Sequence, residues 1–141
     1  MRLCLDTDVL IRLFIPHPPF SEILDAILNG QITILLSNDI LLEYEEVVIR
    51  EFGQRRWAKI QAFLAVMSNL HHNVLEIDPH FRFRVIADDA DDNKFADCAI
   101  VGEADFIVTY DTHFAALRSA GYKPKPITPE NLVTSTAFKS L

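Results

Sequence analysis

The sequence is poor in cysteine and has no hydrophobic run long enough to cross a membrane. Its two cysteines, Cys4 and Cys98, lie in apolar stretches without a CxxC spacing or a histidine-rich neighbour. We therefore expect two buried free thiols rather than a disulfide. No apolar stretch approaches the ~20 residues of a transmembrane helix, and Asp6 and Asp8 leave no room for the apolar core of a signal peptide. These absences predict a cytoplasmic protein with no membrane segment.

Basic residues are scarce as well. The 13 lysines and arginines oppose 20 aspartates and glutamates, which gives a formal net charge of −7. This balance argues against a generally basic nucleic-acid-binding surface, although it allows a local basic groove. The chain has 141 residues, of which half are apolar and 23% are charged, and it shows no repeats, low-complexity segments or linkers. We expect a single globular domain over residues 1–141.

Short apolar segments alternate with helical patterns along the chain. The segments that read as strands are 2–5, 32–36, 74–77, 105–109 and 125–127. Between them, apolar spacing and capping residues predict helices that begin near Ser21, Ser37, Arg55, Asp91 or Asp92, Asp111 or Thr112, and Pro129. This alternation predicts an α/β fold whose parallel sheet is covered by helices on both faces.

Two aspartates follow predicted strands. Asp6 ends the first strand, and Asp111 lies just beyond the fourth. Open parallel sheets bind ligands outside the carboxyl ends of their strands. If these two strands are neighbours, the two carboxylates meet at one edge of the sheet; the alternative is that each aspartate only caps the helix that follows it.

Two further acids fall on helix faces that are otherwise apolar. Glu43 lies between Ile40 and Val47 at helical spacing, and Asp97 lies within the apolar run FADCAIV. A lone buried carboxylate costs several kcal/mol. Each acid therefore needs a lysine, an arginine or a metal ion as its partner, and only Lys94 adjoins any of the four acids in the sequence.

If all four acids converge, a cation is needed to hold them together. At about 5 Å and an effective dielectric constant near 20, each pair repels by roughly 3 kcal/mol. Carboxylates without clustered histidine or cysteine favour Mg²⁺ or Mn²⁺ over zinc. Such an ion lowers the pKa of a bound water and neutralises charge that develops on a phosphodiester, while a neighbouring carboxylate orients the water. The four acids thus point to phosphodiester hydrolysis.

At these residues the sequence resembles a PIN domain. The matching segments are LDTDVL (5–10), LLEYEEV (41–47), DDNKFADCAIVGEADFIVTYD (91–111) and ITPENL (127–132), which occur in the order of the family. Within the family, the chain most resembles the VapC-like toxin components of prokaryotic toxin–antitoxin pairs. The resemblance implies a three-layer α/β/α fold with a central, mostly parallel sheet of four to five strands, and a Mg²⁺- or Mn²⁺-dependent ribonuclease that cleaves single-stranded RNA.

The resemblance also assigns roles to individual residues. Catalytic and metal-binding roles fall on the four acids, which are Asp6, Glu43, Asp97 and Asp111. Asp92 matches an additional acid of this subgroup and is expected to join the metal site. Thr109 and Ser37 match small hydroxyl residues near the site and are expected to contact substrate. Asp8 departs from the pattern, because relatives often carry Asn, Ser or Thr there; we expect it to cap the first helix.

The resemblance implies three kinds of partner: RNA, an antitoxin protein that occludes the active cleft, and further copies of the chain in a homodimer or higher homo-oligomer. The apolar helix after Arg55 can supply the face between copies or can pack in the core.

Two basic clusters can contact RNA. The first contains Arg55 and Arg56, which we take as substrate-binding candidates, together with Arg50 and Lys59; the alternative is a solvated helix face. The second contains Arg82 and Arg84, flanked by Phe81 and Phe83. A phenylalanine can stack on a base, but we expect these two in the core.

Two alternatives to the ribonuclease stay open. One is a Mg²⁺-dependent phosphatase of the haloacid dehalogenase type, with Asp6 as nucleophile and Asp8 as acid–base partner. It leaves Glu43 unexplained. The other is a catalytically silent PIN-like module that binds RNA or a protein.

Overall fold

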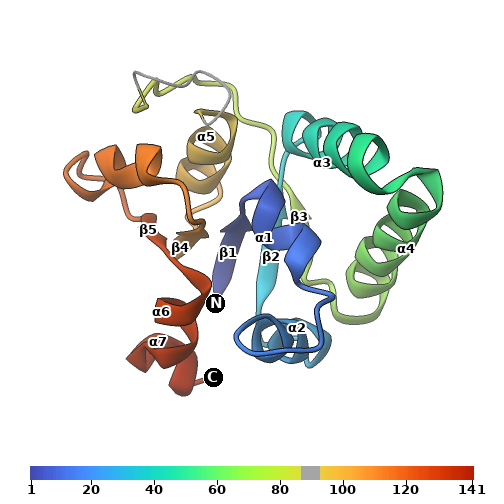
Figure 1. Cartoon of the computed structure of the whole chain (residues 1–141). Coiled ribbons are helices and arrows are strands. Elements are labelled where there is room, and N and C mark those ends of the chain that lie inside the picture. The colour runs from blue at the N-terminus through green and yellow to red at the C-terminus, as the bar shows by residue number, and fades with distance from the viewer. Residues whose placement is uncertain (87–92) are drawn as a thin grey trace.

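The computed structural model describes residues 1–86 and 93–141 (Figure 1). Its strands are β1 (Arg2–Leu5), β2 (Thr33–Leu36), β3 (Val74–Glu76), β4 (Phe106–Val108) and β5 (Lys125–Ile127). Its α-helices are α1 (Thr7–Arg12), α2 (Phe20–Leu28), α3 (Asn38–Phe52), α4 (Gln54–His71), α5 (Asn93–Val101), α6 (Pro129–Thr134) and α7 (Thr136–Lys139), and η1 (Thr112–Arg118) is a 3₁₀ helix.

The strands form one parallel sheet in the order β3-β2-β1-β4-β5. In the central strand, Cys4 lies opposite Leu35 of β2 and Ile107 of β4, and all three are fully buried. A strand that is covered on both faces needs a continuous apolar sequence. The largely apolar segments RLCL, TILL and FIV meet this need, and they form the three central strands of the sheet. The predicted α/β fold with a parallel sheet is confirmed.

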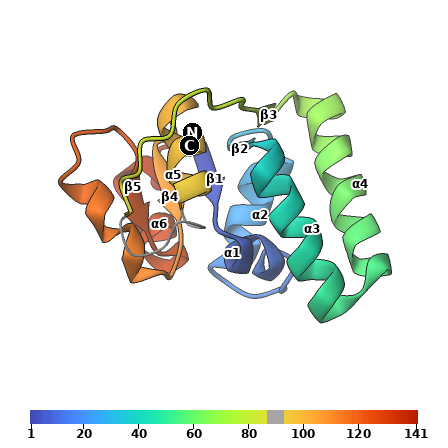
Figure 2. The ribbon, with the colours of Figure 1, turned by 90° about the horizontal axis from the view of Figure 1, so that it is seen from above.

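Helices cover both faces of the sheet (Figure 2). Helix α5 packs against β1, β2 and β4, and α2 and α6 contact each other on the opposite face. Tyr44, Phe95 and Phe114 are the largest fully buried side chains. Phe95 lies 6.3 Å from Tyr44 and 6.4 Å from Phe114 between ring centroids, so one aromatic cluster joins α3, α5 and η1.

Several local predictions need correction. Helix α2 begins one residue before Ser21, and Pro19 stands at its N-cap without a side-chain hydrogen bond. On α4, Trp57, Ile60, Leu64 and Met67 are buried, so this part of the helix packs in the core, whereas Leu70 is 65% exposed. Phe81 is 73% exposed and Phe83 is only partly buried, so the expectation that both belong to the core is wrong. The helix start predicted at Asp91 or Asp92 lies outside the described residues.

Both cysteines are buried free thiols, as expected. Within the described residues, no helix combines the length and the apolar character that crossing a bilayer requires.

Candidate active site

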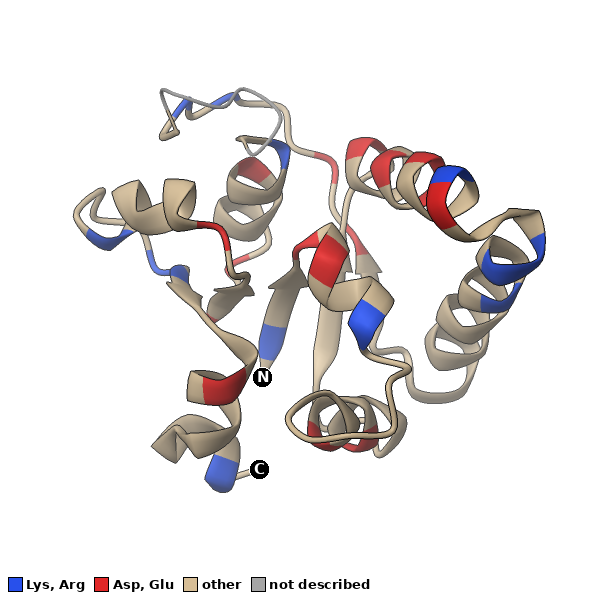
Figure 3. Ribbon diagram, in the orientation of Figure 1, with Lys and Arg blue, Asp and Glu red and all other residues tan. Residues whose placement is uncertain are grey.

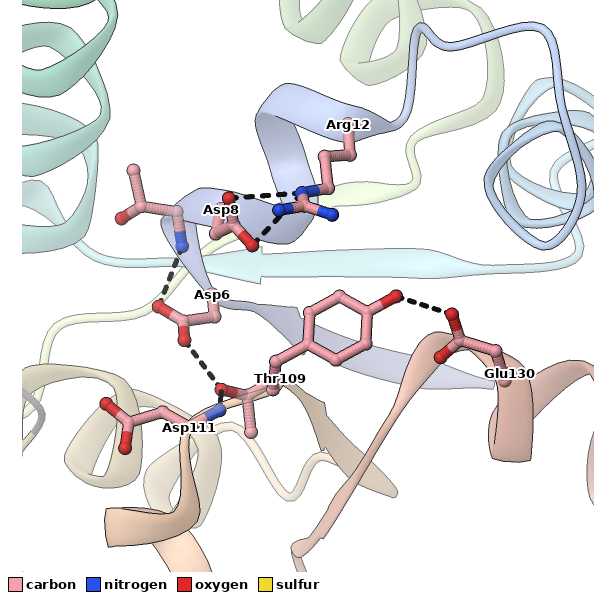
Figure 4. Close-up of polar contacts among 8 residues, drawn as sticks. Asp6, Asp8, Arg12, Thr109, Asp111 and Glu130 are labelled. Carbon is pink, nitrogen blue, oxygen red and sulfur yellow. Dashed lines mark hydrogen bonds and ion pairs between the residues drawn. The ribbon is translucent and has the colours of Figure 1, made fainter.

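Asp6 stands at the carboxyl end of the central strand, where the chain turns into α1. It is the N-cap of that helix: its backbone is extended, and its Oδ1 accepts a hydrogen bond from the Thr7 amide at 2.9 Å. Its Oδ2 accepts a second hydrogen bond, from the Thr109 hydroxyl, at 2.6 Å (Figure 4). Both oxygens of Asp6 are therefore held in fixed positions.

Asp111 lies on the neighbouring strand connection, because β4 pairs with β1. Its backbone amide donates to the Thr109 hydroxyl oxygen at 2.9 Å, so Thr109 bridges Asp6 and Asp111. Asp111 also caps η1 through Oδ1, which accepts from the His113 amide at 2.9 Å. The same oxygen lies 3.3 Å from His113 Nδ1. Both strand-end acids thus cap helices and also share one hydrogen-bonded edge of the sheet.

Glu43 reaches this edge from α3. Its Oε2 accepts a hydrogen bond from the hydroxyl of Thr7, the residue whose amide binds Asp6. Its Oε1 lies 2.9 Å from Lys94 Nζ, and the two side chains are 21% and 23% exposed. The partner that the sequence required for Glu43 is therefore the lysine at the start of α5.

Asp97 is nearly buried on the next turn of α5, with 8% of its surface exposed. Its Oδ1 accepts a hydrogen bond from the Phe83 amide at 3.0 Å. Burial raises the pKa of Asp97, while the Phe83 amide and the positive charge of Arg82 act in the opposite direction. Its compensating contacts come from the segment between β3 and α5.

Asp6 feels the negative charge of two of the other acids, Glu43 and Asp111. Burial is the largest cause that raises the pKa of Asp6; the hydrogen bonds from Thr109 and Thr7 oppose it, and the negative charges of Glu43 and Asp111 raise it further. The like charges at this edge therefore repel, which is the condition that a cation relieves.

Glu43 and Asp97 line a cleft of about 920 Å³ between α3, α5 and the segment that follows β3. Ser37, Lys94 and Arg82 also line it. Glu43 is thus the residue common to the cleft and to the hydrogen-bonded edge that holds Asp6 and Asp111. Figure 3 shows acidic positions along α3 and at the strand ends, and basic positions on the segment between β3 and α5.

The donor chemistry of the acids fits a hard divalent cation. All four offer carboxylate oxygens, which Mg²⁺ and Mn²⁺ prefer, and the mutual repulsion at Asp6 is what such an ion would neutralise. In residues 1–86 and 93–141, however, no group of three or more His, Cys, Asp or Glu side chains is arranged to hold a metal ion. The ammonium of Lys94 supplies the positive charge at Glu43 instead.

Other predicted site residues occupy different positions. Thr109 is 3% exposed and donates its hydroxyl proton to Asp6, so it orients that carboxylate. Ser37 caps α3, with its hydroxyl oxygen 3.3 Å from the Ile40 amide, and it lines the cleft. Arg55 and Arg56 lie on α4 away from the cleft lining, with Arg56 5.6 Å from the centre of the Phe52 ring. Asp92 lies outside the described residues.

Asp8 does not cap α1, contrary to expectation, because Asp6 holds that position. Its carboxylate pairs with Arg12 one turn later, with Oδ2 at 3.1 Å from Nε. A phosphatase of the haloacid dehalogenase type would need Asp8 as its acid–base partner, and this ion pair gives that interpretation no support.

Two contacts of the site were missed in the sequence. Thr7 links Asp6 to Glu43. Its position directly after an aspartate that ends a strand was the sequence feature that could have indicated this contact. Phe83 binds Asp97 through its backbone amide, which no side-chain pattern can reveal.

The fold, together with Asp6, Glu43 and Asp111 at the carboxyl edge of the sheet, defines an α/β/α domain with an acidic site at the end of its parallel strands. A model of the PIN domain family matches residues 2–113, so the chain belongs to the PIN domain family. Members of this family are generally nucleases that depend on a divalent metal. No curated protein sequence shows a significant match.

Among solved structures, the chain is similar to VapBC2 from Rickettsia felis bound to a DNA fragment from their promoter. The similarity has a TM-score of 0.55 with 18% sequence identity, and it covers 89% of this chain and 98% of the other. At this identity the likeness concerns the fold, and it agrees with the α/β/α architecture.

Proposed function

We propose that this protein is a Mg²⁺- or Mn²⁺-dependent endoribonuclease that cleaves single-stranded RNA and acts as the toxin of a toxin–antitoxin pair. The observation that carries the proposal is the hydrogen-bonded set of Asp6, Glu43 and Asp111 at the carboxyl edge of the sheet, in a chain of a family whose members are generally nucleases. The similar fold of VapBC2 supports the toxin role and an antitoxin protein as partner.

The residues proposed to hold the metal are the four acids and Asp92. The ion, when bound, neutralises charge on the scissile phosphate and lowers the pKa of a water. Thr109 and Thr7 hold the carboxylate of Asp6 in one orientation, so its position is set before substrate arrives. Glu43 connects this edge with the cleft, where the buried Asp97 faces substrate.

The proposal also includes the assembly of the chain with copies of itself and its location in the cell. The family resemblance favours a homodimer or a higher homo-oligomer in the cytoplasm. On α4, Val66 and Leu70 are 52% and 65% exposed, and they are the candidates for a face between copies of the chain.

Replacement of Asp6 or Asp97 tests the activity. Asp6→Asn and Asp97→Asn are each expected to abolish Mn²⁺-dependent cleavage of a labelled single-stranded RNA, because an amide cannot supply the negative charge that the metal needs. Circular dichroism should show an unchanged fold.

The matched control is Asp8→Asn, which removes an exposed acid from the same helix start. It is expected to retain most RNA cleavage, whereas a phosphatase would lose its activity. Undiminished cleavage by both Asp6→Asn and Asp97→Asn would refute the assignment. Binding of RNA by the wild-type chain without cleavage at any Mn²⁺ concentration would support the silent module instead.

A further inference from the structure

The segment between β3 and α5 forms one wall of the cleft and exposes an unusual set of side chains. Phe81 is 73% exposed, and Arg82 and Arg84 are also exposed, whereas Phe83 is partly covered. Phe81, Arg82 and Arg84 all line the cleft that contains Glu43 and Asp97. We refer to residues 81–86 as the cleft wall; Figure 1 shows this part of the chain running above the sheet toward α5.

The cleft wall is fastened to the domain at two points. Phe83 donates its amide to Asp97 and packs edge-on against Tyr122, with ring centroids 5.3 Å apart. Ile86 is 3% exposed, and its backbone makes two hydrogen bonds with the Asn93 side chain, at 3.0 and 2.8 Å. Phe83 and Ile86 thus hold the backbone of the cleft wall in place, while the side chains of Phe81, Arg82 and Arg84 remain exposed. A backbone that is already fixed lowers the entropic cost of binding a ligand.

The backbone of Arg84 has an unusual conformation. Its φ of +50° lies in the left-handed region, which residues with a Cβ adopt rarely. Strained backbone of this kind concentrates at binding and catalytic sites. Here it falls on a cationic side chain that lines the cleft.

The positive charge of the cleft wall is available to an anion. Within the described residues, neither Arg82 nor Arg84 has an acidic partner within 4.0 Å. Guanidinium groups bind phosphate oxygens in a bidentate manner. On a chain with a net charge of −7, these two arginines line the same cleft as the proposed metal-binding acids Glu43 and Asp97. They therefore offer positive charge to a phosphate backbone beside those acids.

Phe81 provides the apolar part of the surface. An exposed aromatic ring that lines the same cleft as two arginines matches the way in which proteins hold unpaired bases, by stacking. The cleft volume of about 920 Å³ lies in the upper part of the roughly 300–1,000 Å³ range of sites for drug-sized ligands, so it has room for a nucleotide.

We propose that the cleft wall binds the single-stranded RNA substrate, with Arg82 and Arg84 on its phosphates and Phe81 stacked on an unpaired base. The inference rests on the proposed ribonuclease function and assigns its substrate contacts to this segment instead of to Arg55 and Arg56 on α4.

The test measures binding of a fluorescently labelled single-stranded RNA oligonucleotide by anisotropy, in EDTA so that metal-dependent cleavage does not occur. The double variant Arg82→Ala/Arg84→Ala is expected to weaken binding at low salt by at least about tenfold. It should also reduce the slope of log K against log [salt] by roughly 0.7 for each phosphate that the protein no longer neutralises. The matched control, Arg55→Ala/Arg56→Ala, removes the same charge outside the cleft and should change both quantities much less.

The stacking of Phe81 on a base has its own signature. Phe81→Ala is expected to weaken binding by roughly 5- to 150-fold, the effect of removing one base–aromatic stack, without a change in salt dependence. Phe52→Ala, which removes a 49% exposed phenylalanine at the end of α3, is the control. Phe81→Trp should keep the affinity, and RNA should quench its added indole fluorescence.

The outcomes separate the two levels of the proposal. If the wild-type chain cleaves RNA in Mn²⁺ but the cleft-wall variants keep the wild-type affinity and salt slope, the cleft-wall inference is overturned, the nuclease stands, and a protein partner becomes the explanation for the exposed surface. If Arg55→Ala/Arg56→Ala weakened RNA binding as much as Arg82→Ala/Arg84→Ala, the loss would come from the change in net charge, and the cleft-wall inference would also be overturned. If the wild-type chain neither binds nor cleaves single-stranded RNA, the proposed function itself fails. Thermal unfolding of each variant verifies that these exposed substitutions leave the fold intact.

Discussion

Single hydrogen bonds decide how the acids of this site are presented. Thr109 has one hydroxyl proton and donates it to Asp6, while its oxygen accepts the Asp111 amide. Thr7 uses its amide for Asp6 and its hydroxyl for Glu43. These two threonines therefore link the carboxylates of Asp6 and Glu43 to each other and to the backbone of Asp111. Burial raises the pKa of Asp6, and the negative charges of Glu43 and Asp111 raise it further.

Lys94 supplies the positive charge beside Glu43 that a metal ion would otherwise provide. Lys94→Met should lower the stability of the metal-free protein by about 1 kcal/mol or less, the usual value of a partly exposed ion pair. It should also strengthen Mn²⁺ binding several-fold, because the ion no longer competes with the ammonium 2.9 Å from Glu43. Isothermal titration calorimetry and thermal unfolding measure both effects.

Lys123→Met is the control, since Lys123 pairs at 3.3 Å with Asp105, an acid outside the proposed site. It should leave Mn²⁺ affinity unchanged. Weaker Mn²⁺ binding by Lys94→Met would contradict the idea that this lysine stands in for the metal.

The position of α5 carries much of the site, because this helix holds both Lys94 and Asp97. It packs against β1, β2 and β4, and its close approach to β2 depends on Gly102 at its end. A Cβ at Gly102 would lie 2.6 Å from Leu35 Cδ1 and 3.0 Å from the Cys98 carbonyl oxygen. Leu35 is fully buried and cannot move without disturbing the core.

Gly102→Ala is accordingly expected to destabilise the protein by about 1–3 kcal/mol through overpacking and to reduce cleavage by shifting α5. Urea denaturation measures the stability. Gly121→Ala serves as the control, because a Cβ there meets nothing within 4 Å and only the backbone strain of φ +82° is added. If Gly102→Ala lowered the free energy of unfolding less than Gly121→Ala, the position of α5 would not depend on the close contact between Gly102 and Leu35.

For the molecule as a whole, the fold takes the carboxylates of Asp6 and Asp97 partly or wholly out of water, and stability should depend on pH accordingly. Burial raises the pKa values of Asp6 and Asp97 above their usual value of 3.8. Between the usual and the raised values, the folded state binds more protons than the unfolded state. The contribution of these groups to stability is therefore fully present below about pH 3.8 and is lost as the pH rises through the raised values.

We therefore expect Asp6→Asn to stabilise the metal-free protein at neutral pH, with a gain over the wild type that shrinks as the pH falls toward 4. Urea denaturation in EDTA at several pH values measures this difference. Asp105→Asn should behave in the opposite way: burial acts against it, but the Arg2 amide and Lys123 lower the pKa of Asp105, so its contribution is present above about pH 3.8 and lost in acid. A gain for Asp6→Asn that is independent of pH would contradict the burial argument.

Much of the fold could be predicted from the sequence, because burial on both faces leaves apolar runs such as ITILL and helical spacing such as that of Trp57, Ile60 and Leu64. The prediction failed where one residue serves an unusual local purpose. Phe81 has the hydrophobicity of a core residue and is exposed, and Asp8 has the chemistry of a cap but Asp6 holds that position.

The sequence by itself determined the element order, the parallel sheet and the identity of the acids, since these follow from local periodicity and from the cost of burying a charge. Only the tertiary structure decided which groups meet: that Lys94 pairs with Glu43, that Thr109 bridges Asp6 and Asp111, and that the Phe83 amide binds Asp97. Those contacts join segments far apart in the chain, and they arise from strand order and helix packing, which local residue patterns do not encode.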